Sequence, residues 1–189
     1  VPVEARPLRI VSQHECVCGD EPAARRQRLD DFAGEALQLG EIIQVVEHFR
    51  TEDQIHFIRQ RVRHEIQYAE LDIRLGGKLG PQSGPPIDAR AKVLKVAKDV
   101  TIEFGGQRKG VNPIGDVAAL QIEGVTVIVN SKRSQCHSRD CFTKLGVDPS
   151  TKKIVVVKSM QHFHAAYAPI ASEVVYVAAP GALVPDWSL

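Results

Sequence analysis

The chain has 189 residues, of which 43% are hydrophobic and 25% are charged, ordinary proportions for one globular domain with a hydrophobic core. Its formal net charge of +1 gives no electrostatic case for binding nucleic acid or an anionic membrane. No apolar stretch is long enough to span a bilayer, and four cysteines are too few for a disulfide scaffold. We therefore expect a cytoplasmic protein with reduced thiols and with neither nucleic-acid nor membrane partners.

The composition of the chain changes near residue 70. Residues 1–70 contain nine Arg and no Lys and have a net charge of −4, whereas residues 71–189 contain ten Lys and have a net charge of +5. The first part favours helices: one is predicted over 21–39 before Gly40, and apolar residues from Ile42 onward recur at helical spacing. Because the chain starts at Val1 rather than Met, we expect it to be part of a longer protein.

Residues 71–189 favour strands separated by turns. Alternating patterns predict strands over 71–75, 91–97 and 100–104, and a hairpin over 115–131 that turns at Glu123 and Gly124. A short helix is predicted over 139–145, a buried strand over 152–159, a helical segment capped by Ser159, and a last strand over 173–179. The sequence thus predicts an α/β fold, with a mixed β-sheet and interleaved helices.

Three stretches of this second part resemble the C-terminal domain of the microcystinase C (MlrC) family. They are RLGGKLGPQSGPPI (74–87), GVTVIVNSKRSQC (124–136) and FTKLGVDPSTKKIVVVKSMQHFHAAYAPIASEVVYVAAPG (142–181), and the most specific feature is the order VKS, HF, AA, PIA, V-Y-V, PG. The resemblance implies a single C-terminal-type domain over 71–189 of a zinc metallopeptidase that hydrolyses peptide amide bonds. It also implies an N-terminal partner domain that holds the zinc through Asp and His ligands, and a peptide substrate.

The resemblance does not extend to residues 1–70. Just before the stretch that matches RLGGK, family members carry a glycine-rich loop and a Gly-Asp-Ser/Thr helix start, which suit anion binding. The corresponding region here reads HECVCGDEPAARRQRLDDFAGEALQLG and contains only three Gly. Either the chain is a divergent member or about the first seventy residues are translated out of frame, and the excess of Arg over Lys favours the second explanation.

The candidate site residues are Lys158, Ser159 and His162. Lys158 and Ser159 end a predicted buried strand, and ligands of α/β folds gather beyond the carboxyl ends of strands. On the predicted helix, His162 would share a face with Ser159. Such a cluster, with the N–H groups of a helix start, would suit a peptide carboxylate or a developing oxyanion. In the alternative interpretation, Ser159 is only a helix cap and Lys158 a solvated neighbour.

Metal signals in the sequence are weak. His162 and His164 form an HxH pair, but on a helix the two side chains would point about 200° apart. The four cysteines and His137 lack the paired C-x₂₋₄-C knuckles that are typical of structural zinc. The zinc ligands of the family cannot be assigned to any residue here, so we expect no metal on this chain.

Two functions of different class remain open. In the first, the chain is the cleft-completing domain of a zinc amidohydrolase, inactive without its N-terminal domain. In the second, it is a non-catalytic domain, either a stand-alone binding domain or the remnant of a disrupted gene. The resemblance over residues 71–189 favours the first.

Overall fold

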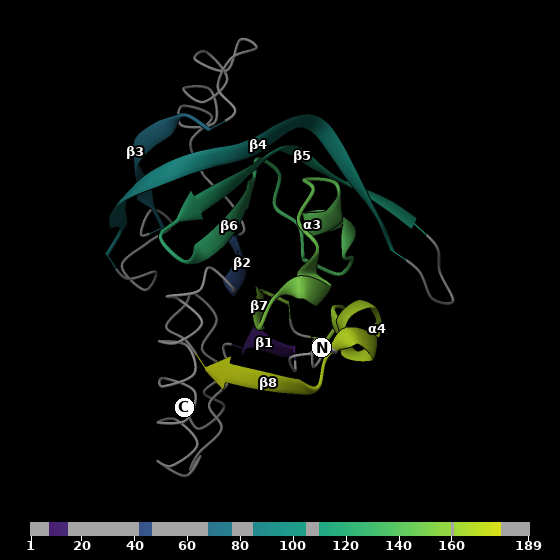
Figure 1. Ribbon diagram of the computed structural model, residues 1–189. Helices are drawn as coiled ribbons and strands as arrows, with labels where there is room; N and C mark the ends of the chain where they lie inside the picture. The colour runs from purple at the N-terminus through teal and green to yellow at the C-terminus, as the bar shows by residue number, and fades with distance from the viewer. Residues whose placement is uncertain are drawn as a thin grey trace, which may run out of the picture.

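A computed structural model describes residues 8–14, 42–46, 68–76, 85–104, 110–159 and 161–178. Eight strands in these ranges form one sheet in the order β3-β4-β5-β6-β2-β7-β1-β8 (Figure 1). They are β1 (Arg9–His14), β2 (Ile42–Val46), β3 (Glu70–Leu75), β4 (Ile87–Phe104), β5 (Gly110–Ile122), β6 (Val125–Asn130), β7 (Ile154–Val157) and β8 (Glu173–Ala178). The sheet is mixed, because β3 to β6 pair antiparallel and the strands from β6 through β2, β7 and β1 to β8 pair parallel.

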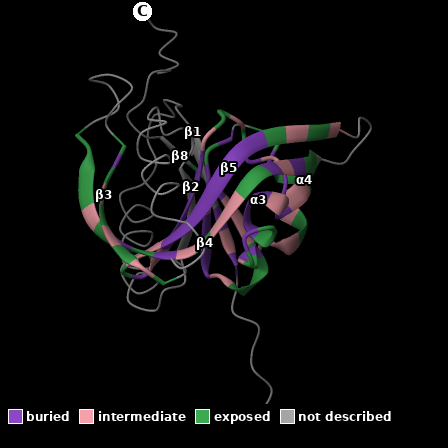
Figure 2. Cartoon of the chain, turned by 90° about the horizontal axis from the view of Figure 1, so that it is seen from above, coloured by how far each residue is buried: buried purple, intermediate pink, exposed green. Residues whose placement is uncertain are grey.

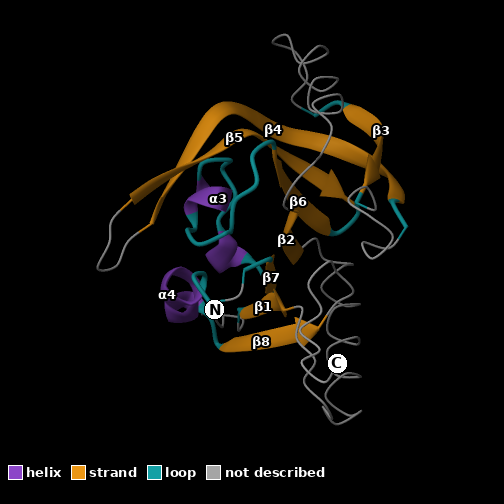
Figure 3. Cartoon of the chain, turned by 180° about the vertical axis from the view of Figure 1, so that it is seen from behind, coloured by secondary structure: helices purple, strands orange, loops and turns teal. Residues whose placement is uncertain are grey.

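The described chain is mostly β-sheet, and its helices are short (Figure 3). The α-helices α3 (Asp140–Thr143) and α4 (His164–Tyr167) are single turns, followed by the 3₁₀ turns η2 (Pro149–Thr151) and η3 (Ala168–Ile170), respectively. The predicted mixed sheet and the hairpin of β5 and β6 are therefore present, but these helices are too short to form continuous helical layers. None of the helices in the described ranges is long and apolar enough to cross a membrane.

Strands β1 and β2 come from the first seventy residues and lie inside the sheet. β1 pairs with β7 on one side and β8 on the other, and β2 lies between β6 and β7. The helical expectation for the segment from Ile42 is therefore wrong at 42–46. A short run rich in β-branched residues suits a strand with parallel neighbours on both sides, and helical spacing over a few residues cannot exclude it. The helix predicted over 21–39 lies outside the described residues, and the division of the chain at residue 70 stays a prediction.

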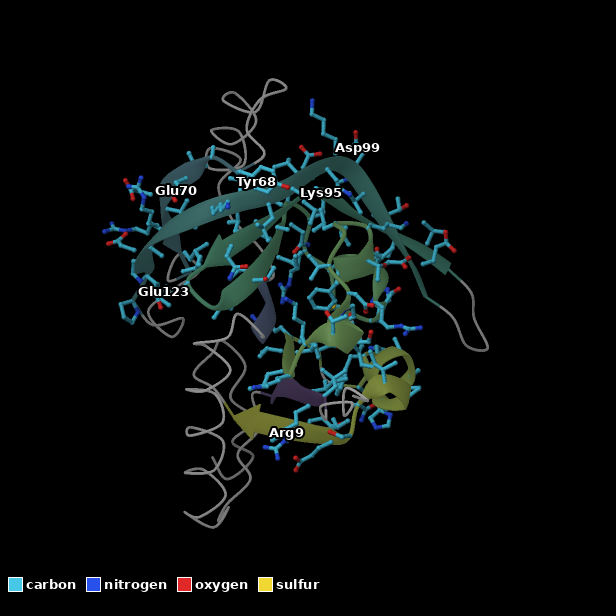
Figure 4. The ribbon with its side chains drawn as sticks, in the orientation of Figure 1. Arg9, Tyr68, Glu70, Lys95, Asp99 and Glu123 are labelled. Atoms are coloured by element: carbon cyan, nitrogen blue, oxygen red, sulfur yellow. The ribbon has the colours of Figure 1, made fainter. Side chains whose placement is uncertain are left out.

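Strand β4 is one long, bent strand where two strands were predicted. Its register with β5 shifts between Ala97 and Val100, and Asp99 has a positive φ of 49° at this point. The Asp99 amide donates to the carboxylate of Asp116, with 3.1 Å between nitrogen and oxygen. Such a β-bulge bends the strand and increases its twist. Asp99 consequently lies at the crest of the arch that β4 makes over α3 (Figure 4).

The arch of β4 holds α3 at both ends. The Lys95 ammonium donates to the carbonyl oxygen of Lys144, just after the last turn of α3, at 3.1 Å. At the other end, the Glu103 amide donates to the carboxylate of Asp140 at 3.0 Å. A cation at the C-terminus of a helix and a carboxylate in its first turn both complement the helix ends. These contacts fix the short helix against the sheet.

The middle of strand β5 is buried on both faces. Every residue of β5 from Ile114 to Leu120 is buried, which Figure 2 shows as a continuous stretch. Side chains along a strand alternate between faces, and here they alternate between two hydrophobic clusters. Val117 and Ala119 belong to the cluster that contains α3 and α4, and Ala118 and Leu120 to the cluster that contains β3. The first cluster also includes Cys136 and Phe163, from the segments that follow β6 and β7.

Candidate functional site

The segments that follow β6 and β7 meet beyond the carboxyl ends of the parallel strands. Lys158 and Ser159 directly follow β7, and the segment 131–138 follows β6. Strands β6, β2 and β7 run in the same direction, so both segments leave the sheet at the same edge. This edge is where open α/β sheets place their ligands.

Gln135 brings two of the three predicted site residues together. Its side-chain oxygen Oε1 lies 2.9 Å from Nδ1 of His162 and accepts a hydrogen bond from the Ser159 hydroxyl at 3.4 Å. His162 and Gln135 are exposed, whereas Ser159 is only 4% exposed. Lys158, the third predicted residue, is exposed beside them in the chain. The site therefore has a buried hydroxyl beneath an exposed amide and imidazole.

Hydrogen bonds to β5 hold the segment that carries Gln135. The Lys132 amide donates to the carbonyl oxygen of Ile114 at 3.1 Å, and the Asn112 side chain donates to the Ser134 hydroxyl at 2.6 Å. The Ser134 hydroxyl in turn donates to the carbonyl oxygen of Gln135 at 3.2 Å. These bonds place the Gln135 backbone relative to the sheet, which is what a preorganised polar site requires.

A second imidazole, that of His137, lies near His162. Partial burial is the main cause that lowers the pKa of His137, the nearby imidazole of His162 lowers it further, and a hydrogen bond with the backbone of Gln135 opposes the shift. The two rings are thus close enough to influence each other electrostatically. His137 favours its neutral form in the folded protein.

A buried tyrosine ties α4 to the segment after β6. The Tyr167 hydroxyl donates to the carbonyl oxygen of Ser138 at 2.8 Å and lies 3.0 Å from Sγ of Cys136. Its ring packs edge-to-face on Phe142 of α3, with ring centres 6.1 Å apart. Burial raises the pKa of Tyr167 well above its usual value, so the hydroxyl stays a neutral donor. Cys136 and Cys141 are both buried.

The structure corrects the predicted helix start at Ser159. Helix α4 begins at His164, and Phe163 occupies its cap position without a side-chain hydrogen bond. The first backbone bond of this turn runs from the His164 amide to the carbonyl oxygen of Gln161, at 3.0 Å. Ser159 and His162 therefore do not share a helix face next to unpaired N–H groups. They are close because both reach the same side-chain oxygen.

Gln135 and His137 were not among the predicted site residues. Both lie in the loop after β6, far in sequence from Ser159, and no local spacing connects the two segments. The available signal was that Gln135 lies within one of the stretches that resemble the family, next to its last residue. In the ranges that the structure describes, no group of three or more His, Cys, Asp or Glu residues could hold a metal ion. The described residues of this site therefore do not fit a zinc centre.

Comparison with known proteins defines the class of this domain. The family described as MlrC C-terminus matches residues 63–189, and the chain belongs to this family. The predicted resemblance is thereby confirmed, and the match begins slightly before residue 71.

Two relatives are informative. Over 110 residues, 58% of this chain and 21% of the relative, the sequence is 37% identical to microcystinase C from a Sphingomonas species. The crystal structure of a candidate metallopeptidase from Mesorhizobium sp. BNC1 matches 94% of this chain and 34% of its own chain, with a TM-score of 0.69 at 22% identity. The second likeness concerns the fold. The chain thus spans about a fifth of the first protein and about a third of the second.

Proposed function

We propose that this chain is the C-terminal, cleft-completing domain of a microcystinase-like zinc metallopeptidase that hydrolyses peptide amide bonds, and that it is inactive without the zinc-binding N-terminal domain. Membership of the MlrC C-terminus family and the identity to microcystinase C support the relation to peptidases. The observation that carries the proposal is the convergence of His162 and Ser159 on Gln135, beside Lys158, at the carboxyl edge of the parallel strands.

The zinc of the proposed enzyme is assigned to the N-terminal domain. Catalytic zinc needs three protein ligands and an open position, and the described part of this chain offers no cluster of that kind. The metal would supply Lewis-acid chemistry, while this domain would supply polar groups that face the peptide. A cytoplasmic location belongs to the same proposal, and the free thiol of Cys141 agrees with it.

Each predicted residue has a different part in this proposal. The exposed ammonium of Lys158 is suited to a peptide carboxylate, and the exposed imidazole of His162 is available to a polar group of the peptide. Ser159 is buried, so it supports Gln135 from beneath.

The test is a chimera. The whole of this chain replaces the C-terminal portion of microcystinase C, because β1 and β2 from the first seventy residues belong to the sheet. We expect the chimera to hydrolyse a peptide substrate and the isolated chain to hydrolyse none. In the chimera, His162→Ala should lower kcat/KM ten-fold or more, on the order of 1.4 kcal/mol.

His164→Ala is the matched control, since His164 is also exposed and packs edge-on against Phe163 at 6.1 Å. It should leave kcat/KM nearly unchanged. Hydrolysis by the isolated chain would contradict the need for an N-terminal domain. A folded chimera that binds peptide but never cleaves it would favour the stand-alone binding domain instead.

A further inference from the structure

We propose that Gln135 is a positioning residue that fixes the tautomer of His162, so that Nε2 of His162 presents a lone pair and accepts a hydrogen bond from an N–H group of the substrate. This inference rests on the proposed function and gives the site a more specific chemistry: it recognises a peptide amide or ammonium donor at His162.

The argument starts from the shared oxygen. A side-chain amide oxygen can only accept hydrogen bonds. Oε1 of Gln135 lies 2.9 Å from Nδ1 of His162, so Nδ1 must carry the hydrogen in this bond. The Ser159 hydroxyl, 3.4 Å away, donates to the same oxygen. Two donors from different segments thus converge on one acceptor.

Several bonds fix the orientation of this acceptor. Ser159 is buried, and the Gln135 carbonyl oxygen accepts from both the Ser134 hydroxyl and the His137 amide, the latter at 3.0 Å. The backbone that carries Gln135 is therefore held on both sides. Because its backbone is held and its oxygen accepts from both Ser159 and His162, the Gln135 side chain keeps this oxygen directed towards the two donors.

The tautomer decides what His162 can offer a ligand. A neutral imidazole carries one hydrogen, and when Nδ1 holds it, Nε2 is an acceptor. Such a ring pairs with an N–H donor and repels a carboxylate or an oxyanion. The exposed ammonium of Lys158 is the group suited to a carboxylate. The structure therefore divides the roles that the sequence had assigned to the cluster as a whole.

The tautomer can be measured on the purified chain with long-range ¹H–¹⁵N NMR of labelled histidines. The pH should be about 8.5, where imidazoles with an ordinary pKa of about 6.5 are neutral. Seven histidines contribute signals, and a His162→Gln variant identifies those of His162. Gln135→Met removes the amide acceptor with little change in volume, and Gln135→Glu restores an acceptor that has no N–H. Gln161→Met is the matched control, because Gln161 is an exposed glutamine directly before His162.

We expect His162 to show the Nδ1–H tautomer in the wild type, in Gln135→Glu and in Gln161→Met, and to lose that preference in Gln135→Met. An Nε2–H tautomer in the wild type would overturn the inference, since the amide would then donate to Nδ1. An unchanged tautomer in Gln135→Met would overturn it as well. If Gln135→Met fails to fold, the wild type compared with Gln135→Glu still decides the direction of the bond.

The measurement requires neither zinc nor catalysis. An inactive chimera with the expected tautomer would count against the proposed function alone. An active chimera with the opposite tautomer would count against the role of Gln135 alone.

Discussion

Gly115 lies where β5 approaches the segment after β6, and its φ is +76°. A Cβ atom at this position would lie 2.2 Å from the Ser131 hydroxyl oxygen and 3.0 Å from Cγ of Lys132. The same hydroxyl oxygen accepts the Asp116 amide at 2.8 Å. Gly115→Ala should therefore combine backbone strain with displacement of Ser131 and lower the free energy of unfolding by about 2–3 kcal/mol, measured by urea denaturation.

Gly146 supplies the control for this prediction. Its φ is also +76°, but among the described residues nothing apart from its own chain neighbours lies within 4 Å of the position that a Cβ would take. Gly146→Ala should cost only the backbone strain, about 1 kcal/mol. Equal losses in the two variants would show that the close approach to Ser131 does not matter.

Tyr167→Phe is expected to destabilise the protein by about 1–2 kcal/mol, because it leaves the carbonyl oxygen of Ser138 without its hydroxyl donor. The loss should also depend on pH. Burial raises the pKa of Tyr167, so the folded protein retains a proton that the unfolded chain releases at about pH 10. The wild type should therefore lose stability relative to Tyr167→Phe as the pH rises above about 10.

The check is the difference in unfolding free energy between the two proteins at pH 7 and above pH 10. A difference that stays constant would mean that Tyr167 ionises equally in the folded and unfolded states.

At the residue scale, the sequence suggests His162 and Ser159 as candidates but not Gln135, the side chain that both of them contact. Ser159 could be proposed from its position directly after a predicted buried strand, because the apolar run that predicts this strand is adjacent to it in the sequence. Gln135 follows a different strand, and its pairing with His162 depends on β2 lying between β6 and β7. No local pattern contains that information.

At the scale of elements, Ile10 tests whether β1 is integral to the fold. Its side chain is fully buried in the cluster that also contains Phe142 and Tyr167. Ile10→Ala should lower the free energy of unfolding by about 2–5 kcal/mol, because it removes a packed side chain and leaves a cavity.

Val111→Ala is the comparison for Ile10→Ala. Val111 is a β-branched strand residue that is 63% exposed, and its truncation should change stability by about 0.5 kcal/mol or less. If thermal or urea denaturation gave Ile10→Ala the same small effect, β1 would not contribute to the core. Arg9, which lies 3.2 Å from Glu173 of β8, would then be a surface contact only (Figure 4).

The elements that the sequence predicted well are those with local signals. The hairpin of β5 and β6 turns at Glu123 and Gly124 as expected, because the turn residues and the alternation are adjacent in the chain. The bend of β4 at Asp99 was interpreted as a break between two strands, since a bulge interrupts the alternation that defines one strand. Strand β2 was interpreted as helix because five residues are too few to separate the two periods.

At the scale of the whole molecule, we expect the purified chain to retain well under one zinc ion per molecule after dialysis. The described residues contain no cluster of three ligands, and the proposed function assigns the metal to another domain. Elemental analysis of the dialysed protein is the measurement. One tightly held zinc per chain would contradict that assignment.

At this scale, the sequence predicted family membership directly, because motifs such as VKS followed by HF are short patterns within one stretch of the sequence. The order of strands in the sheet cannot be predicted in this way. The sheet inserts β2 between β6 and β7, and β1 between β7 and β8, so neighbouring strands come from opposite ends of the chain. Periodicity within a segment says nothing about such partners.

The position of β1 also sets the order in which the domain can be completed. The carbonyl oxygen of Leu8 accepts hydrogen bonds from both the amide and the hydroxyl of Ser172, 164 residues further along the chain. Among the strands of this sheet, β1 is synthesised first, yet both of its neighbours, β7 and β8, are the last two. The backbone of β1 cannot form its sheet hydrogen bonds until β7 and β8 have been synthesised, and strand pairings of such long sequence separation form slowly. Nascent chains that stop before residue 173 would carry β1 with one edge open, a state prone to pair with other chains.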